Sequence, residues 1–490
     1  MLSIKKLEQA ENEKKQDKKI ERELPYFITL VSLLASSGLG PYTILQKIKE
    51  INLLPVIRAE TVKILKRVDM LGIDPLTALS QAKDKPSSRA LGEFLGGYVS
   101  AIQSGGNVIN YLKSKMSSSY DRLEASEKQS VEKLSGIVHA WLTMQIVILA
   151  VFILVAAMGS NPITGSAGGQ GSQPPYLLLI FSPVISIAFM KIVQKMNSAN
   201  VQELKMKYIL KFMLPPMLVG IGLILSNLLS SMNVNAYILG GALAAGSIMP
   251  ALKFKKIYVA NLHAEAATPQ ILRDITEARK AGMGPEKCIV HACKRKDFKS
   301  FNIVANTIAN KLEWGIPLSN IFETLYKDVK NFHVLISFRI LFEIITSGGG
   351  NVNTLDSLAD ASEKIHNITK TKRDMLQPYV MVGFMLIVIT GFTTLLTIDS
   401  FTDINQEKNL VHGNVPIGGS SKGATSNLLD VVSVAIIAQA WLAGLFIGKI
   451  TKGAYSGGFM YSMLLTIISM GAIGMIQLHV INIGAIIKTS

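Results

Sequence analysis

Seven long apolar stretches constrain the fold of this 490-residue chain more than any other feature of its sequence. A helix needs about 20 mainly apolar residues to cross the hydrocarbon core of a bilayer. The stretches predicted to do so are residues 138–159, 176–196, 212–232, 236–252, 376–396, 428–450 and 459–477. The third and fourth are expected to form a hairpin that turns at residues 233–235. A content of 49% hydrophobic and only 17% charged residues also favours a membrane protein.

Charge is distributed unevenly around these stretches, and this distribution predicts their orientation. Two large polar segments, residues 1–137 and 253–375, alternate with the apolar blocks. A short basic segment between the second and third stretches carries Lys191, Lys195, Lys205, Lys207 and Lys211. On the opposite side, residues 160–175 carry no charge, and residues 397–427 hold three acids and two bases, a formal net charge of −1. Because basic loops stay cytoplasmic, we expect a multi-pass cell-membrane protein with both large polar segments in the cytoplasm.

The two large polar segments share one framework of small turns and prolines. The sequence "LLASSGLGPYTI" at residues 33–44 matches "EARKAGMGPEKC" at residues 277–288, 244 positions later. Further on, "MLGIDPLTAL" aligns with "EWGIPLSNIF", and "AIQSGGNV" aligns with "IITSGGGNV". The spacing is kept over more than 80 residues, which predicts an internal duplication.

Each of these marks has a backbone explanation, so the marks indicate the fold and not the chemistry. Proline suits the first position of a helix, and Asp before it suits the N-cap. We therefore expect helices to begin at Pro41, Pro75, Pro285 and Pro317, with Asp74 as an N-cap. The predicted turn residues are Gly38, Gly40, Pro41, Gly105, Gly106, Gly282, Gly284, Pro285, Gly348 and Gly349. Apolar residues at helical spacing, such as Leu30, Leu33 and Leu34, predict that each copy is a bundle of five or six helices.

The predicted fold class is an all-α polytopic membrane protein with two repeated cytoplasmic helical bundles and about seven transmembrane helices. Its expected parts are a charged N-terminal segment (residues 1–24), a first bundle (25–137), a block of four spans (138–252), a second bundle (253–375) and a block of about three spans (376–490). The N-terminal segment lies outside the shared pattern, and its role stays unassigned.

At the motifs quoted above, the chain resembles the type II secretion system F-domain family. These are the inner-membrane platform proteins of type IV pili, type II secretion systems and archaella. The four-span block between the copies looks like the archaeal branch, which includes the archaellum J protein and relatives that serve adhesive pili. The resemblance implies a platform for filament assembly, with the archaellum favoured. Its implied partners are a hexameric secretion ATPase, type IV pilin-like or archaellin subunits and the lipid membrane, with a homodimer left open.

Two basic groups in the second polar segment are the candidate partner-binding residues. The first comprises Lys294, Arg295, Lys296 and Lys299, and the second comprises Lys370, Lys372 and Arg373. Such clusters can face anionic lipid headgroups. The alternative interpretation is a docking surface for an acidic rim of the ATPase, which would be sensitive to salt.

The sequence contains no complete motif for catalysis or for binding a cofactor or a metal, so we expect a protein that is not an enzyme and has no cofactor. The sequence "GLFIGKI" (residues 444–450) lacks the spacing and the hydroxyl residue of a phosphate-binding loop, and its Gly444 and Gly448 suit close helix packing instead. The sequence "CIVHAC" contains both cysteines, Cys288 and Cys293, but no set of four metal ligands. Basic residues beside the predicted spans account for much of the net charge of +16, so no nucleic acid partner is expected.

A secondary membrane transporter with duplicated halves is the alternative function. Transporters and proton relays commonly carry an ionisable residue at membrane depth. No charged residue lies near the centre of a predicted span, which disfavours this alternative.

Overall fold

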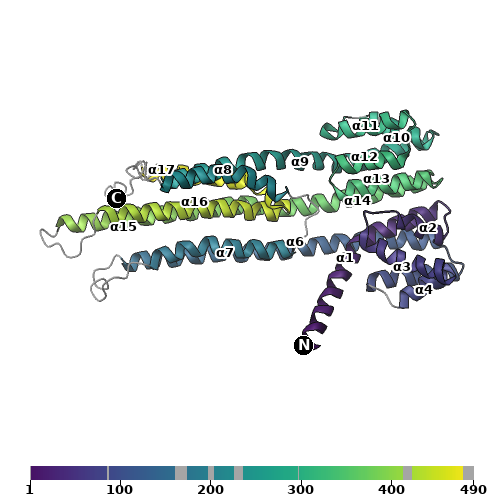
Figure 1. Ribbon diagram of the computed structural model, residues 1–490, viewed down its shortest axis with the longest axis horizontal. Helices are drawn as coiled ribbons and strands as arrows, with labels where there is room; N and C mark the ends of the chain where they lie inside the picture. Colours follow the sequence, from purple (N-terminus) through teal and green to yellow (C-terminus); the bar gives the residue numbers. More distant parts are fainter. Residues whose placement is uncertain are drawn as a thin grey trace. The chain divides into compact units, whose positions relative to one another are not determined.

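The computed structural model describes residues 2–84, 88–159, 174–196, 204–225, 235–295, 297–411 and 422–477. All regular secondary structure in these ranges is helical (Figure 1). The chain divides into two compact units. We call the first, Met1–Gln129 with Tyr258–Lys372, the bundle unit, and the second, Ser130–Ile257 with Arg373–Ser490, the span unit.

The first half of the bundle unit is built from five helices and the start of a sixth. They are α1 (Leu2–Ser36), α2 (Pro41–Lys49), α3 (Pro55–Leu71), α4 (Pro75–Asp84), α5 (Arg89–Gln103) and α6 (Val108–Gly159). The apolar positions of α1 face the interior, because Leu30, Leu33 and Leu34 are buried as their helical spacing predicts. The charged N-terminal segment continues into the same helix, and Ile20 and Leu24 at its end already belong to the core.

The second half of the bundle unit has the same order of elements. It comprises the end of α9 (Asn235–Lys280), α10 (Pro285–Arg295), the 3-10 turn η2 (Lys299–Phe301), α11 (Asn302–Glu313), α12 (Leu318–Asp328), α13 (Phe332–Thr346) and α14 (Val352–Leu376). One hydrophobic core includes residues of both halves, from Ile20 to Ile365. The two segments that share the sequence framework therefore contribute to one hydrophobic core.

Proline positions explain where several of these helices begin. Pro41, Pro75 and Pro285 are the first residues of α2, α4 and α10, as predicted. Asp74 caps α4, because its carboxylate accepts hydrogen bonds from the backbone N–H groups of Leu76 and Thr77. The prediction for Pro317 is wrong by one position. Pro317 is the N-cap of α12, with φ −58° and ψ 144°, because the fixed φ of proline also suits the extended N-cap conformation.

The predicted glycine turns lie between the helices. Gly38 and Gly282 have φ values of +88° and +86° after α1 and α9, a conformation that residues with a Cβ seldom adopt. Gly349, in the turn after α13, lies so close to Ser37 that a Cβ on Gly349 would overlap the Ser37 hydroxyl. The ends of α1 and α13 therefore meet at one end of the bundle unit.

Polar contacts join the two halves inside this unit. The Tyr26 hydroxyl and His333 Nδ1 share a hydrogen bond of 2.8 Å. Burial lowers the pKa of His333, so the ring is neutral and suits this contact. Glu343 on α13 is paired with Lys47 of the first half at 3.0 Å and with Arg339 on its own helix at 3.1 Å. A carboxylate that is only 5% exposed thus depends on a cation from the other half.

The span unit contains the remaining helices. They are the end of α6, α7 (Pro174–Met196), α8 (Met206–Leu225), the start of α9, α15 (Pro378–Val411), α16 (Lys422–Lys452), the 3-10 turn η3 (Tyr455–Gly457) and α17 (Phe459–Gln477). Five helical segments in the described ranges are long and apolar enough to cross a membrane, at Val108–Val151, Met206–Leu223, Asn235–Lys280, Val352–Thr394 and Val432–Lys452, and Phe459–Met475 is a shorter apolar helix. The protein is thus a helical membrane protein, whereas the total of seven spans stays a prediction. Most of the predicted turn at residues 233–235 lies outside the described residues.

Helices α16 and α17 pack backbone against backbone. A Cβ on Gly444 would overlap the backbone of Ser462, and a Cβ on Gly448 would overlap the backbone of Gly458. The prediction that these two glycines serve close helix packing is confirmed. Small residues at such positions allow helices to approach closely in a membrane.

Candidate functional site

The first basic group lies at the end of α10 and in the turn that follows it. Lys294, Arg295 and Lys299 are exposed, whereas Lys296 lies outside the described residues. Lys299 has a φ of 56°, the one positive φ of a non-glycine residue in the described ranges. Its backbone N–H donates to the Asp297 carboxylate at 2.9 Å, which holds the turn.

Two of these cations already have partners inside the bundle unit. Lys294 Nζ lies 2.7 Å from the Glu313 carboxylate on α11. Arg295 lies 3.2 Å from the buried Asp274 carboxylate on α9. Both pairs are partly exposed, so water and salt screen them. The basic group therefore fastens α10 to its neighbours and presents less free charge than the sequence indicates.

The second basic group is divided between the two units. Lys370 and Lys372 end the bundle unit, and Arg373 begins the span unit. Lys372 Nζ donates to Glu127 on α6 at 2.6 Å and so joins the two halves of the bundle unit, whereas Lys370 is exposed. The role of all seven basic residues in partner binding stays a prediction.

The structure adds two exposed apolar side chains that the sequence analysis missed. Ile303 and Trp314 are both 77% exposed, at the start and just past the end of α11. Their separation of 11 residues is close to three helical turns, which places them on one face. Trp314 follows Glu313, the partner of Lys294, and Ile303 follows Lys299 by four positions. We call Lys294, Lys299, Ile303 and Trp314 the α11 face.

The position in the first half that corresponds to Trp314 also carries an exposed apolar side chain. Leu71, 243 positions before Trp314, is 68% exposed at the end of α3. Each of these residues precedes a glycine with positive φ, Gly72 or Gly315. In the sequence, each exposed residue is a large apolar side chain directly before the glycine that ends its helix. The sequence alone does not show which face of the helix is covered by its neighbours, so the exposure of Leu71 and Trp314 could not be predicted.

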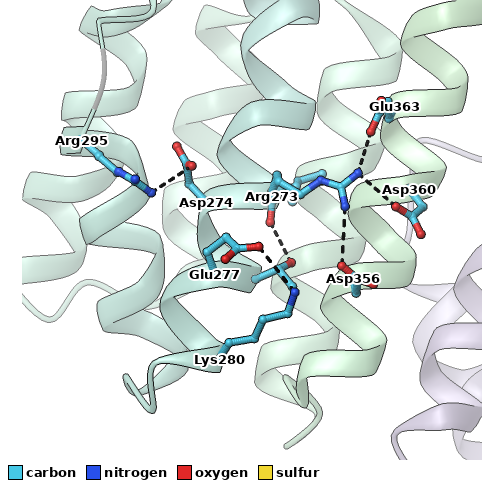
Figure 2. A network of polar contacts seen from close by, with 10 residues as sticks. Arg273, Asp274, Glu277, Lys280, Arg295, Asp356, Asp360 and Glu363 are labelled. Carbon is cyan, nitrogen blue, oxygen red and sulfur yellow. Dashed lines mark hydrogen bonds and ion pairs between the residues drawn. The ribbon is translucent and has the colours of Figure 1, made fainter.

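A network of ion pairs joins α9 to two neighbouring helices of the bundle unit. Figure 2 shows Arg273 of α9 pointing toward three carboxylates of α14. The distances are 3.7 Å to Asp356, 3.2 Å to Asp360 and 2.7 Å to Glu363. The acids recur at helical spacing and lie along one face of α14. Together with the pair of Arg295 and Asp274, also drawn in Figure 2, these contacts connect α9 to both α10 and α14.

The two cysteines are packed as small apolar groups. Cys288 and Cys293 are fully buried, and burial raises the pKa of Cys293 to about 12. A thiol in this environment is a poor nucleophile. No group of three or more His, Cys, Asp or Glu side chains in the described part of the chain is arranged to hold a metal ion.

Comparison with known proteins places the chain in a family. The family of type II secretion system (T2SS) protein F matches residues 27–158 and 271–398, which together make up more than half of the chain. The protein therefore belongs to this family, whose members are non-enzymatic membrane platform proteins that generally work with a secretion ATPase and pilin subunits. An uncharacterized protein of Methanocaldococcus jannaschii is 21% identical, over 90% of this chain and 80% of the relative. No solved structure matches.

Proposed function

We propose that this protein is the cytoplasmic-membrane platform for assembly of an archaeal type IV pilus-like filament, and we specify the archaellum as that filament. In this role it couples a cytoplasmic hexameric secretion ATPase to the insertion of pilin-like or archaellin subunits. The observation that carries the proposal is the double match to the protein F family. Each matched segment begins in one half of the bundle unit and ends in a helix of the span unit, α6 or α15.

The proposed orientation places the bundle unit in the cytoplasm, where ATP is hydrolysed. The absence of charge from the sequence of residues 160–175 and the basic segment around Lys205 to Lys211 support this orientation. Because α6 is one continuous helix from Val108 to Gly159, a force applied to the bundle unit reaches the spans without an intervening loop. We propose that the two bundles are copies of one module and that they move together, since they share one core.

The proposed contact with the ATPase is the α11 face. Tryptophan is enriched among the residues that contribute most to protein–protein binding. The lysines beside Trp314 and Ile303 complement an acidic surface and speed the encounter with it at low salt. A homodimer of the chain would present two such faces to a ring of six subunits.

Replacing Trp314 by alanine is expected to weaken binding of the purified secretion ATPase to the full-length protein in nanodiscs by about 30-fold, since a hot-spot residue contributes about 2 kcal/mol. The variant Lys294→Glu, Lys299→Glu, which reverses both lysines of the α11 face, is expected to weaken it further and to reduce its salt dependence. Tyr326→Ala is the matched control, because Tyr326 is an exposed aromatic residue on the neighbouring helix α12.

The double variant Lys294→Glu, Glu313→Lys keeps the internal ion pair. It therefore distinguishes an effect on ATPase binding from an effect on the stability of the fold. It is expected to weaken ATPase binding at an unchanged thermal midpoint. Equal ATPase affinity of the wild type, the Trp314 variant and the variant Lys294→Glu, Lys299→Glu would overturn the assignment of the α11 face. No binding of the ATPase to the wild-type protein would overturn the proposed coupling.

A further inference from the structure

The span unit contains a small, mainly apolar cavity with several polar groups in its wall, between four helices of the unit. The cavity has a volume of about 60 Å³ and is lined by residues of α6, α7, α15 and α16. Its polar lining consists of Gln145, Ser182, Thr390, Thr394 and Gln439, and the rest of the wall is apolar. These residues lie inside stretches that are otherwise apolar, and no acidic or basic side chain lines the cavity.

The hydrogen bonds around the cavity do not use all of its donors. Gln145, which is 5% exposed, accepts a hydrogen bond from Ser182 at 2.7 Å and donates to Ser186 at 3.2 Å. Trp141 and Gln439 also donate to the Ser186 oxygen, each at 3.1 Å. A hydroxyl oxygen has two lone pairs, so it cannot satisfy three N–H donors at once. Each glutamine carboxamide also carries two N–H groups, and its contact with Ser186 uses one of them, so Gln145 and Gln439 each keep an N–H for another acceptor.

The same cavity also presents acceptors. The Thr390 hydroxyl donates to the Leu386 carbonyl at 2.9 Å, and the Thr394 hydroxyl donates to the Thr390 carbonyl at 2.7 Å. Each hydroxyl thus uses its proton within α15, and its oxygen keeps lone pairs for a further partner. The wall can both donate and accept, which matches a carboxamide or a protonated carboxyl group.

Size and position narrow the class of ligand. A cavity of 60 Å³ has room for about four water molecules. This space suits the terminal polar group of one side chain and is too small for a typical transported solute. Thr390 and Gln439 are partly exposed, so the cavity opens at the surface of the span unit. Unpaired polar groups are costly in hydrocarbon, and polar side chains of membrane helices commonly bond to a neighbouring helix.

We propose that this cavity binds the terminal carboxamide or protonated carboxyl group of one side chain on a transmembrane helix of a second protein. Gln439 and Gln145 would donate hydrogen bonds to this group, and Thr390 would accept one. The site would select membrane helices by a single hydrogen-bonding residue. That the bound helix belongs to a filament subunit rests on the proposed function, whereas the site itself rests on the cavity and its hydrogen bonds.

A pair of synthetic transmembrane helices tests the proposal. Both have a leucine-rich core of roughly 20 residues with flanking lysines, and they differ in one central residue, glutamine or leucine. With the full-length protein in nanodiscs, the glutamine helix is expected to bind about 3- to 30-fold more tightly, the range that one hydrogen bond between membrane helices provides. Gln439→Met, which keeps the length of the side chain but not its amide, is expected to abolish the preference.

Gln194→Met is the matched control, since Gln194 lies outside the cavity and accepts a hydrogen bond from Tyr455. It should leave the preference intact. If Gln439→Met does not fold, Thr390→Val is the second variant, and it should reduce the preference at least twofold. Equal binding of both helices to the wild-type protein would overturn the proposal and leave a cavity for water only.

Two further outcomes separate this proposal from the proposed function. A preference for the glutamine helix without any ATPase binding would support the site and overturn the coupling. ATPase binding without a preference for the glutamine helix would support the coupling and overturn the site. Flux of a small solute into liposomes, lost in Gln439→Met, would overturn the proposed site in favour of the transporter alternative.

Discussion

Replacing Gly448 by alanine is expected to separate α16 from α17 and to lower the thermal midpoint of the protein strongly. A Cβ at this position would overlap the backbone of Gly458, and backbone atoms cannot turn away as a side chain can. Overpacking of this kind costs about 1–3 kcal/mol even where side chains can yield, so we expect at least the upper end of this range. Gly444→Ala should act similarly, because it meets the backbone of Ser462.

Gly471→Ala provides the control on the facing helix α17. An added Cβ there would meet no neighbouring helix within 4 Å, so this substitution should be neutral. The measurement is the thermal midpoint of each variant in nanodiscs. A midpoint of Gly448→Ala equal to that of Gly471→Ala would contradict the backbone contact.

Replacing Glu343 by glutamine is the second substitution with a large expected effect. It leaves Arg339 and Lys47 without their shared carboxylate at the contact between the two halves of the bundle unit. Removing one partner from a buried ion pair costs about 3–5 kcal/mol. Since Lys47 is partly exposed and can be hydrated, we expect about 3 kcal/mol, the lower end of that range.

Hydrogen exchange of the amides in α2, which carries Lys47, and in α13 measures this effect, because it reports local opening. Glu323→Gln is the matched control, since Glu323 is exposed on α12. Exchange in α13 should accelerate in Glu343→Gln and stay unchanged in the control. Equal protection in both variants would show that the ion pairs of Glu343 do not stabilise the contact.

The features that follow from local backbone chemistry could be predicted from the sequence. Pro41 and Pro285 begin helices because a proline ring restricts its own φ and lacks an N–H, whatever surrounds it. Gly38 and Gly282 adopt positive φ for an equally local reason. Pro317 shows the limit of such arguments, because the N-cap and the first helical turn both accept proline and the choice depends on the neighbouring helix.

The features that depend on packing could not be predicted in the same way. Lys294 and Arg295 are a basic cluster in the sequence, but Glu313 and Asp274 reach them only in the folded bundle. Gln145 and Gln439 are single neutral residues in apolar stretches, 294 positions apart, and only the helix packing brings both to Ser186. The family could be recognised because its turns recur in order, whereas the choice of filament has no comparable signal in this chain.

The orientation of the bundle unit is the central claim, because a cytoplasmic ATPase can act only on a cytoplasmic surface. The two natural thiols cannot report it. Cys288 and Cys293 are buried, so neither is expected to react on either side of the membrane. An introduced cysteine is needed, and Ser319 is an exposed position on α12 that can carry it.

The most direct measurement is therefore labelling of Ser319→Cys in intact cells with a membrane-impermeant maleimide. The variant Ser166→Cys, in the uncharged sequence segment at residues 160–175, is the reference for the opposite side. We predict that Ser166→Cys is labelled in intact cells and that Ser319→Cys is labelled only after the membrane is permeabilised. Labelling of Ser319→Cys in intact cells would contradict the account, because the bundle unit would then face away from the ATPase.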